Sequence, residues 1–140
     1  MPIKVKPNAI SLFSGMGGDT QGLIDAGFSV KAYSEKESAF RETHDENFKN
    51  CALIGDGDIL KTTDDEFSAY KGSIDLIFAG FPCQGFSNAG KKKVNDPRNT
   101  LFKEFIRATK LVNPKYIIGE NVKGLLGRKT GDDEMYIDVI

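Results

Sequence analysis

The stretch that decides the fold is Ala79–Asn88, which reads Ala-Gly-Phe-Pro-Cys-Gln-Gly-Phe-Ser-Asn. The apolar run Ile74–Ala79 leads into it between turn-forming residues, a pattern typical of a buried strand. Gly80 and Pro82 end this strand, because glycine permits a sharp turn and proline fixes one dihedral angle and lacks a backbone donor. We therefore expect Cys83 on a constrained loop beyond the carboxyl end of a strand, the edge where open α/β sheets bind ligands.

The two cysteines of the chain are interpreted differently. Free cysteines are most often small buried hydrophobic residues, and Cys51 is expected to be one of them. A loop beside proline and glycine is a poor place to bury a side chain, so an accessible, functional thiol is favoured at Cys83. The spacing of the two cysteines fits neither a disulfide framework nor a zinc pattern.

The composition is that of a globular protein with no global preference for nucleic acid. The chain has 140 residues, 39% hydrophobic and 28% charged, which predicts one domain or less. Its net charge of -1 means that any nucleic-acid surface must be local. With one histidine, no multi-histidine metal site is possible, and we expect no metal. The sequence shows neither a signal peptide nor the run of about 20 apolar residues that spans a bilayer, so a cytoplasmic, nucleoid or nuclear location is expected.

Apolar runs alternate with helical patterns, which predicts a doubly wound, mostly parallel α/β sheet. The expected strands are Ala9–Phe13, Ser29–Tyr33, Cys51–Ile54, Ile74–Ala79 and Tyr116–Gly119. The expected helices are Thr20–Ala26, one from the Ser34/Glu37 capping-box spacing to about Phe48, one from the Thr63/Glu66 spacing to about Tyr70, and one capped by Asn99 or Thr100. One face of the sheet would lack cover near its end, so we expect residues 1–140 to be part of a longer enzyme or one subunit of a split one.

The segment Phe13-Ser14-Gly15-Met16-Gly17-Gly18 joins the first strand to the first helix. Glycines there allow a ligand to approach the backbone at a helix N-terminus. The dinucleotide fingerprint would need a glycine at Thr20, which disfavours NAD, and no Gly-Lys-Ser or Gly-Lys-Thr is present to form a P-loop. We therefore interpret this segment as a loop that binds a nucleoside ligand without phosphate. The alternative is a tight turn that binds no ligand.

Acidic residues follow three of the expected strands. Glu35 follows the second strand and can accept hydrogen bonds from both ribose hydroxyls, although a solvated carboxylate at a helix start is the alternative. Asp58 and Ile59 lie beyond the third strand, where an acid and an aliphatic group suit the amino group and the face of adenine. Glu120 follows the fifth strand, which neighbours the fourth in such a sheet, so it is expected to face Cys83 and to act as its acid partner in covalent catalysis.

Two further features allow more than one interpretation. The three consecutive lysines have two interpretations. They bind DNA phosphates, or they belong to an ordinary solvated loop; the residues are Lys91, Lys92 and Lys93. A Cys–His hydrolase would need His44 beside Cys83, but His44 is expected on the second helix, away from that edge.

Three of these segments, in this order and spacing, resemble the C5-type cytosine-specific DNA methyltransferases: Phe13–Gly18, Gly80–Ser87 and Glu120-Asn121-Val122. The segment Asp96–Phe102 is similar to the family's Asp-x-Arg-Gly-x-Leu-Phe, with Asn99 for glycine. The resemblance covers nearly the whole chain. It implies a Rossmann-like methyltransferase fold dependent on S-adenosylmethionine and incomplete at its C-terminus.

The resemblance also implies a mechanism. A cytosine is flipped out of double-stranded DNA, because its ring atoms are unreachable within the stack. Cys83 adds to carbon 6, while Glu120 bonds the ring nitrogen and the exocyclic amine. Carbon 5 then takes the methyl group of S-adenosylmethionine, a base removes the proton on carbon 5, and the thiol leaves.

The resemblance, together with the residues above, assigns three sets of site residues. The catalytic set is Cys83, Glu120, Pro82, Gln84 and Asn121. The cofactor-binding set is Phe13, Ser14, Gly15, Gly17, Gly18, Glu35, Lys36, Asp58, Ile59, Gly80 and Leu101. The DNA-binding set is Ser87, Lys91, Lys92, Lys93 and Arg98.

The chain departs from the family pattern in three respects. Ser11 stands where the family has an acid, which weakens a contact near the methionine end of the cofactor, and Lys36 stands where a large aromatic residue packs on adenine. The sequence also lacks the target recognition domain, the arginine that helps to hold cytosine and the segment that closes the cofactor pocket, which implies a complementing C-terminal subunit or a longer chain. A non-catalytic remnant that binds the cofactor or a partner, and an RNA cytosine-5 methyltransferase, are the alternatives.

Overall fold

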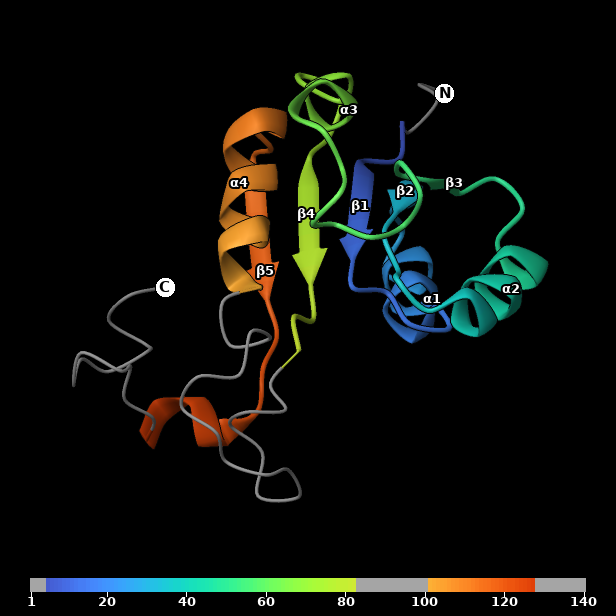
Figure 1. Cartoon of the computed structure of the whole chain (residues 1–140). Coiled ribbons are helices and arrows are strands. Elements are labelled where there is room, and N and C mark those ends of the chain that lie inside the picture. Colours follow the sequence, from blue (N-terminus) through green and yellow to red (C-terminus); the bar gives the residue numbers. More distant parts are fainter. Residues whose placement is uncertain (1–4, 83–100, 128–140) are drawn as a thin grey trace.

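A computed structural model of the protein describes residues 5–82 and 101–127, and it contains a five-stranded parallel sheet (Figure 1). The strands are β1 (Asn8–Leu12), β2 (Ser29–Tyr33), β3 (Ala52–Leu53), β4 (Leu76–Ala79) and β5 (Tyr116–Gly119). Their order is β3-β2-β1-β4-β5, and each neighbouring pair is parallel. This confirms the predicted sheet, including the pairing of β4 with β5. The strand order reverses between β1 and β4, and sheets of this kind bind ligands at that point.

Helices cover both faces of the sheet (Figure 1). They are α1 (Gly18–Asp25), α2 (Ser38–Asn47), α3 (Asp64–Ser68) and α4 (Phe102–Val112), followed by the 3₁₀ helix η2 (Lys123–Gly127). Alternate residues of β1 separate two cores, because successive side chains of a strand point to opposite faces. Ile10 and Leu12 pack with side chains of α3 and α4, whereas Ala9 packs with Leu23 of α1. In the described part of the chain, no helix is both long and apolar enough to cross a membrane.

The structure confirms one of the two predicted capping boxes and contradicts the other. The box at Thr63 is confirmed: the Glu66 amide donates to the Thr63 hydroxyl, and the Thr63 amide donates to the Glu66 carboxylate at 2.7 Å. The box at Ser34 is wrong, because α2 begins after Glu37, which is its N-cap residue. The buried Ser34 hydroxyl instead accepts a hydrogen bond from the Phe13 amide at 3.2 Å, so it joins the ends of β1 and β2.

Other boundaries differ by a few residues at element ends. The first helix begins at Gly18, so this glycine is helical and Gly17 is the N-cap residue. The third strand is shorter than expected, and α3 ends at Ser68 rather than at Tyr70. The helix caps predicted at Asn99 or Thr100 lie outside the described residues.

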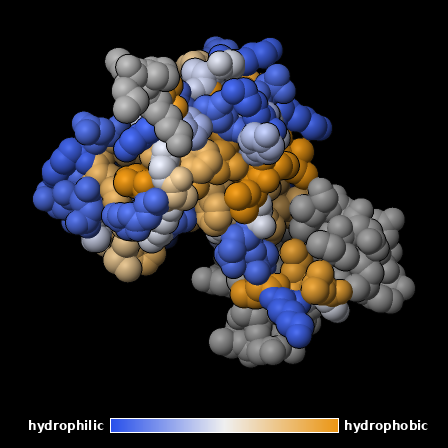
Figure 2. All heavy atoms as spheres, turned by 180° about the vertical axis from the view of Figure 1, so that it is seen from behind, coloured by the Kyte–Doolittle hydropathy of each residue, from blue (hydrophilic) through white to orange (hydrophobic). Residues whose placement is uncertain are grey.

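The edge strand β5 is poorly covered on both faces. Tyr116, Ile117 and Ile118 are 70%, 53% and 48% exposed, and successive residues of a strand face opposite sides. Val122 and Leu126, which follow β5, are also exposed. Figure 2 shows the molecule from behind relative to Figure 1, and hydrophobic side chains are exposed on that face. The lack of cover expected near the end of the sheet is therefore present in the described residues.

Candidate active site

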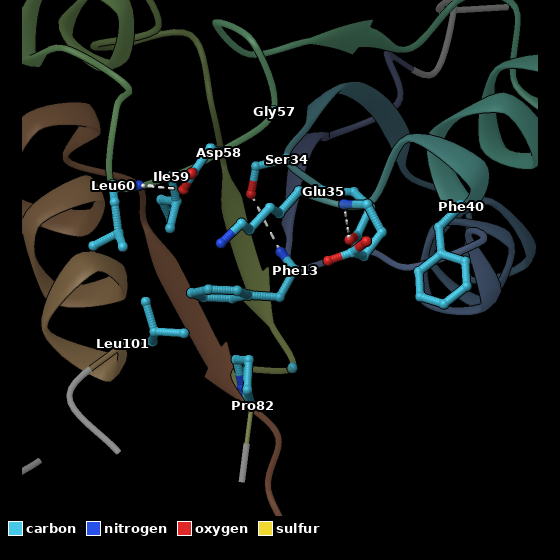
Figure 3. Close-up of a pocket in the computed structure, with 13 residues that line it drawn as sticks. Phe13, Ser34, Glu35, Phe40, Gly57, Asp58, Ile59, Leu60, Pro82 and Leu101 are labelled. Carbon is cyan, nitrogen blue, oxygen red and sulfur yellow. Dashed lines mark hydrogen bonds between the residues drawn. The ribbon is translucent and has the colours of Figure 1, made fainter. Parts of the chain in front are cut away.

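A pocket with a volume of about 460 Å³ opens beyond the carboxyl ends of the strands (Figure 3). The residues of the predicted sets that line it are Phe13, Glu35, Lys36, Asp58, Ile59, Gly80, Pro82 and Leu101. Lining residues that the sequence reasoning missed are Ser34, Glu37, Phe40, Gly57 and Leu60. Segments that are distant in the sequence, after β1, β2, β3 and β4 and before α4, therefore meet at one cavity.

The ring of Phe13 divides the pocket into two sides, and each side has both kinds of lining residue, since Asp58 lies near Ile59 and Phe40 lies on the side of Glu35. Figure 3 shows Ile59, Leu60 and Leu101 on one side of this ring and Glu35 on the other. An aromatic face beside aliphatic groups suits a planar heterocycle, and a carboxylate suits hydroxyl donors. The two sides together suit a nucleoside.

The carboxylate of Glu35 is held in place by two backbone amides. The Gly15 amide donates to Oε2 and the Glu37 amide donates to Oε1, each at 2.8 Å. A carboxylate has about four lone-pair sites, so acceptor capacity remains for a ligand. Glu35 therefore connects the glycine-rich loop to the end of β2.

The loop after β1 has a strained backbone. Phe13 has φ 57°, in the left-handed region, which costs a non-glycine residue roughly 1–2 kcal/mol. The hydrogen bond from its amide to Ser34 stabilises this conformation. Phe13 lines the pocket in this conformation, and strained residues of this kind cluster at functional sites.

Ser14 supports the loop from behind and does not line the pocket. Its hydroxyl is buried and donates to Asp19 Oδ1 at 2.8 Å. Ser11 donates to the other oxygen of Asp19. A carboxylate from α1 thus stands beside Ser11, where the family pattern has an acid in the strand itself.

Gly57 allows the loop after β3 to reach the end of β2. Its φ is 92°, and a Cβ there would lie 2.3 Å from the carbonyl oxygen of Glu35, so only glycine fits. This close approach brings Asp58 into the pocket lining. The alternation Gly55-Asp56-Gly57-Asp58 directly after a strand is the sequence signal that would have identified Gly57.

Residues that follow β5 hold the segment that leads to position 83. The Glu120 amide donates to the Ala79 carbonyl at 2.8 Å, and Asn121 Nδ2 donates to the Phe81 carbonyl at 3.2 Å. A Cβ on Gly80 would lie 3.5 Å from Glu120 Oε2, so this carboxylate lies against the loop after β4. Glu120 itself is exposed.

Several predicted site residues lie outside the described part of the chain. They are Cys83, Gln84, Ser87, Lys91, Lys92, Lys93 and Arg98. The structure places the residues on both sides of this segment, Pro82 and Leu101, in the lining of the same pocket.

The Cys51 thiol and the His44 imidazole, which the sequence analysis placed outside the site, are buried and do not line the pocket. Cys51 is buried, which raises its pKa to about 12, so its thiol is inert at neutral pH. His44 lies in α2, stacked on Tyr33 with ring centroids 3.6 Å apart, and its Nε2 is 2.9 Å from the Thr20 hydroxyl. Burial lowers the pKa of His44. Among the described residues, no group of three or more His, Cys, Asp or Glu side chains could hold a metal ion.

The sheet order and the position of the pocket define an α/β protein with a cavity of nucleoside size at the carboxyl edge of its sheet. A sequence profile of the C-5 cytosine-specific DNA methylase family matches residues 8–137, and the chain belongs to this family.

Individual relatives agree with the family. The type II methyltransferase M.Eco47II of Escherichia coli is 40% identical over 123 residues, which cover 87% of this chain and 28% of that protein. The type II methyltransferase M.AquIA of Picosynechococcus is 40% identical over 127 residues, which cover 87% of this chain and 51% of that protein.

Solved structures show the same relationship. A DNA modification methyltransferase encoded within an E. coli prophage superposes with a TM-score of 0.71 at 35% identity, over 86% of this chain and 33% of that one. A mutant of Spodoptera frugiperda DNMT2 superposes with a TM-score of 0.68 at 27% identity, over 95% of this chain and 40% of that one. The chain therefore spans between 28% and 51% of the length of these proteins.

Proposed function

We propose that the chain is the cofactor-binding and nucleophile-bearing part of an enzyme that methylates carbon 5 of cytosine in DNA. The observation that carries this proposal is the pocket, where predicted cofactor residues from separate segments meet. The pocket borders Gly80 and Pro82, which lead directly to Cys83. Family membership supports the reaction, since the family is that of the cytosine-specific DNA methylases.

The residues present fit S-adenosylmethionine. The ring of Phe13 would stack on adenine, Asp58 would accept from its amino group, and Glu35 would accept from the ribose hydroxyls. The Gly15–Gly18 loop does not line the pocket; it would contact the amino-acid end through backbone amides other than those of Gly15 and Gly17, which donate to Glu35 and Ser14. The volume of about 460 Å³ lies within the range of about 300–1,000 Å³ that is usual for small-molecule sites. When bound, the cofactor supplies an electrophilic methyl group.

The chemistry on cytosine would belong to Cys83 and Glu120. The Cys83 thiolate adds to carbon 6 of a flipped cytosine, and its electron pair moves into the ring. Glu120 hydrogen-bonds the ring nitrogen and neutralises that charge, so that carbon 5 becomes nucleophilic and accepts the methyl group. Loss of the carbon 5 proton to a base then expels the thiolate. The contacts of Glu120 with Gly80 and of Asn121 with Phe81 support this arrangement, because they fix both strand ends at one edge.

The DNA would be held by residues between β4 and α4. Lys91, Lys92, Lys93 and Arg98 carry positive charge in a chain whose net charge is -1. Phosphate contacts of this kind make binding weaker as salt increases. Gln84 and Ser87 would approach the flipped base beside Cys83.

The proposal is tested by transfer of a labelled methyl group from S-adenosylmethionine to duplex DNA, compared with structured RNA. Label in DNA supports the proposal, and label in RNA alone would favour the RNA alternative. A chain that binds the cofactor but never forms a covalent adduct with a duplex containing 5-fluorocytosine, even when a complementing chain is supplied, is a non-catalytic remnant.

Glu35→Gln is expected to weaken binding of S-adenosylmethionine about 10-fold or more, because a hydrogen bond to a charged group contributes about 1.5–3 kcal/mol. Titration calorimetry on the intact chain measures this change. Glu42→Gln is the matched control, since Glu42 is exposed on α2 and does not line the pocket. Equal losses for both variants would contradict the assignment of Glu35 to the ribose.

The open strand β5 supports the proposal that a further polypeptide segment, on this chain or on a second one, completes the catalytic domain. Edge strands present unpaired backbone groups, and Tyr116, Ile117 and Ile118 add exposed apolar surface on both faces. A segment that adds to this edge would bury that surface. It would also lie next to Glu120, which directly follows β5.

Ile118→Lys is expected to lower methylation at least about 10-fold when the part of M.Eco47II outside the aligned region is added as a separate chain. The physical reason is the cost of removing an unpaired charge from water, which amounts to several kcal/mol. Ile24→Lys, on α1, is the control, because Ile24 is also partly exposed (37%) but distant from β5 in the chain and fold. The surface assignment fails if both variants complement equally well.

A further inference from the structure

Arg107 of α4 ties this helix to the loop that forms one wall of the pocket. Its Nη2 donates to the carbonyl oxygens of Ile59 at 3.0 Å and of Thr62 at 2.9 Å. Ile59 and its neighbours Asp58 and Leu60 line the pocket. One guanidinium nitrogen therefore fixes the backbone at both ends of the turn that carries this wall.

The guanidinium of Arg107 is itself held rigidly. Its Nε donates to Glu104 and its Nη1 donates to Asp64 of α3, each at 2.7 Å. Its Cζ lies 5.1 Å from the centre of the Phe67 ring, a cation–π geometry. The side chain is 27% exposed, so these contacts are partly shielded from water. Arginine has five donors in a planar fork, and lysine cannot reproduce this set of directions.

Apolar packing also joins the loop to α4, because Ile59 is buried in the same hydrophobic cluster as Phe105 of that helix. Within the loop, the Asp58 carbonyl accepts from the amides of Lys61 and Thr62, which shapes the turn without orienting it. At the other end, Gly57 packs against the carbonyl of Glu35. The loop is therefore held to β2 through Gly57, and to α4 through the packing of Ile59 and the hydrogen bonds of Arg107.

The same helix also carries the opposite part of the apolar wall. Leu101, the N-cap residue of α4, lines the pocket across from the loop, and Figure 3 shows Ile59, Leu60 and Leu101 gathered on one side of the Phe13 ring. The spacing between Leu101 and Ile59 thus depends on how α4 and the loop are joined. Arg107 makes the hydrogen-bonded part of that connection, although it does not line the pocket.

We propose that Arg107 is a positioning residue for adenine recognition: it sets residues 58–62 against α4 so that Asp58 and the apolar wall meet the adenine ring. This inference rests on the proposed function, since it assigns adenine to this side of the pocket. The remainder of the cofactor site, at Glu35 and the glycine-rich loop, does not depend on Arg107.

The test compares three ligands by calorimetry on the intact chain: S-adenosylmethionine, adenosine, and S-ribosylhomocysteine, which lacks adenine. Arg107→Lys and Arg107→Gln are expected to raise the Kd of the first two about 10-fold, a change of about 1.4 kcal/mol, and that of the third less than about twofold. Lys115→Gln is the control, because it removes an ion pair with Asp75 (2.6 Å) at the amino ends of β4 and β5, and it should change none of the three.

Amide hydrogen exchange of the ligand-free chain gives a second readout. Both Arg107 variants are expected to exchange faster at residues 58–62, with little change in β1 and β2. Arg107→Lys keeps the positive charge, so it serves the test if Arg107→Gln fails to fold. The inference is overturned if all three ligands weaken equally, if adenosine binding is unchanged, or if exchange in the loop is unchanged. A wild-type chain that binds none of the ligands would instead contradict the proposed function, and the exchange result would still decide whether Arg107 sets the loop.

Discussion

Cys83→Ser is expected to abolish methyl transfer to duplex DNA, with a loss of at least about 10³-fold in kcat for the completed enzyme. A serine hydroxyl is far less ionised than a thiol at neutral pH, so it does not add to carbon 6 at a useful rate. The measurement is incorporation of labelled methyl into DNA, together with the loss of the covalent adduct on a duplex that contains 5-fluorocytosine.

Cys51→Ala is the matched control for this experiment. Cys51 is buried between the sheet and its helices, and burial raises its pKa to about 12, so its removal should leave the adduct intact. Cys83→Ser should also keep its affinity for S-adenosylmethionine, because Cys83 is assigned to the cytosine and not to the cofactor. Methyl transfer that survives in Cys83→Ser would eliminate the assigned nucleophile.

Gly17→Ala is expected to lower the free energy of unfolding by about 2–5 kcal/mol. The residue has φ 99°, where a side chain costs roughly 1–2 kcal/mol, and overpacking costs roughly 1–3 kcal/mol more. A Cβ there would lie 2.3 Å from Phe48 Cε2 and 2.9 Å from His44 Cδ2. His44 cannot retreat freely, because it is stacked on Tyr33. Urea denaturation followed by circular dichroism measures the change.

Gly22→Ala is the control, and it should shift stability in the opposite direction. Gly22 lies within α1, and a Cβ there meets nothing within 4 Å. Alanine in a helix interior is more stable than glycine by about 0.5–1 kcal/mol. Destabilisation of similar size in both variants would show that α1, and not the packing of Gly17 on the two rings, limits stability.

The strands were predictable because their apolar runs are short and clearly bounded. The bounds of β2 and β5 agree with the sequence prediction, and the order of elements implied the neighbouring positions of β4 and β5. The capping box at Thr63 was predictable because both of its partners lie within one turn of helix. The same spacing at Ser34 gave a wrong prediction, because the Ser34 hydroxyl accepts a hydrogen bond from the Phe13 amide instead. This tertiary contact outweighs the local preference for a helix cap.

Pocket residues that directly follow a strand could be predicted from the sequence. Contacts between segments that are distant in the sequence could not. Glu35 and Asp58 each follow a strand, so their place at the carboxyl edge could be inferred from the order of elements. Arg107 acts through backbone carbonyls of a segment far away in the sequence, and carbonyl positions leave no trace in residue type. Gly57 also acts through a distant carbonyl, and only its glycine alternation marks it in the sequence. Lys36 lies in the pocket lining where the family pattern has an aromatic ring.

The two amide contacts of Glu35 have a consequence for the thermodynamics of ligand capture. Freezing a mobile glutamate on binding would cost about 1.5–2 kcal/mol of rotamer entropy. Here the Gly15 and Glu37 amides immobilise the carboxylate before any ligand arrives, so that entropy is lost during folding. A ribose then meets an acceptor that is already oriented, and more of its hydrogen-bond energy is available as affinity.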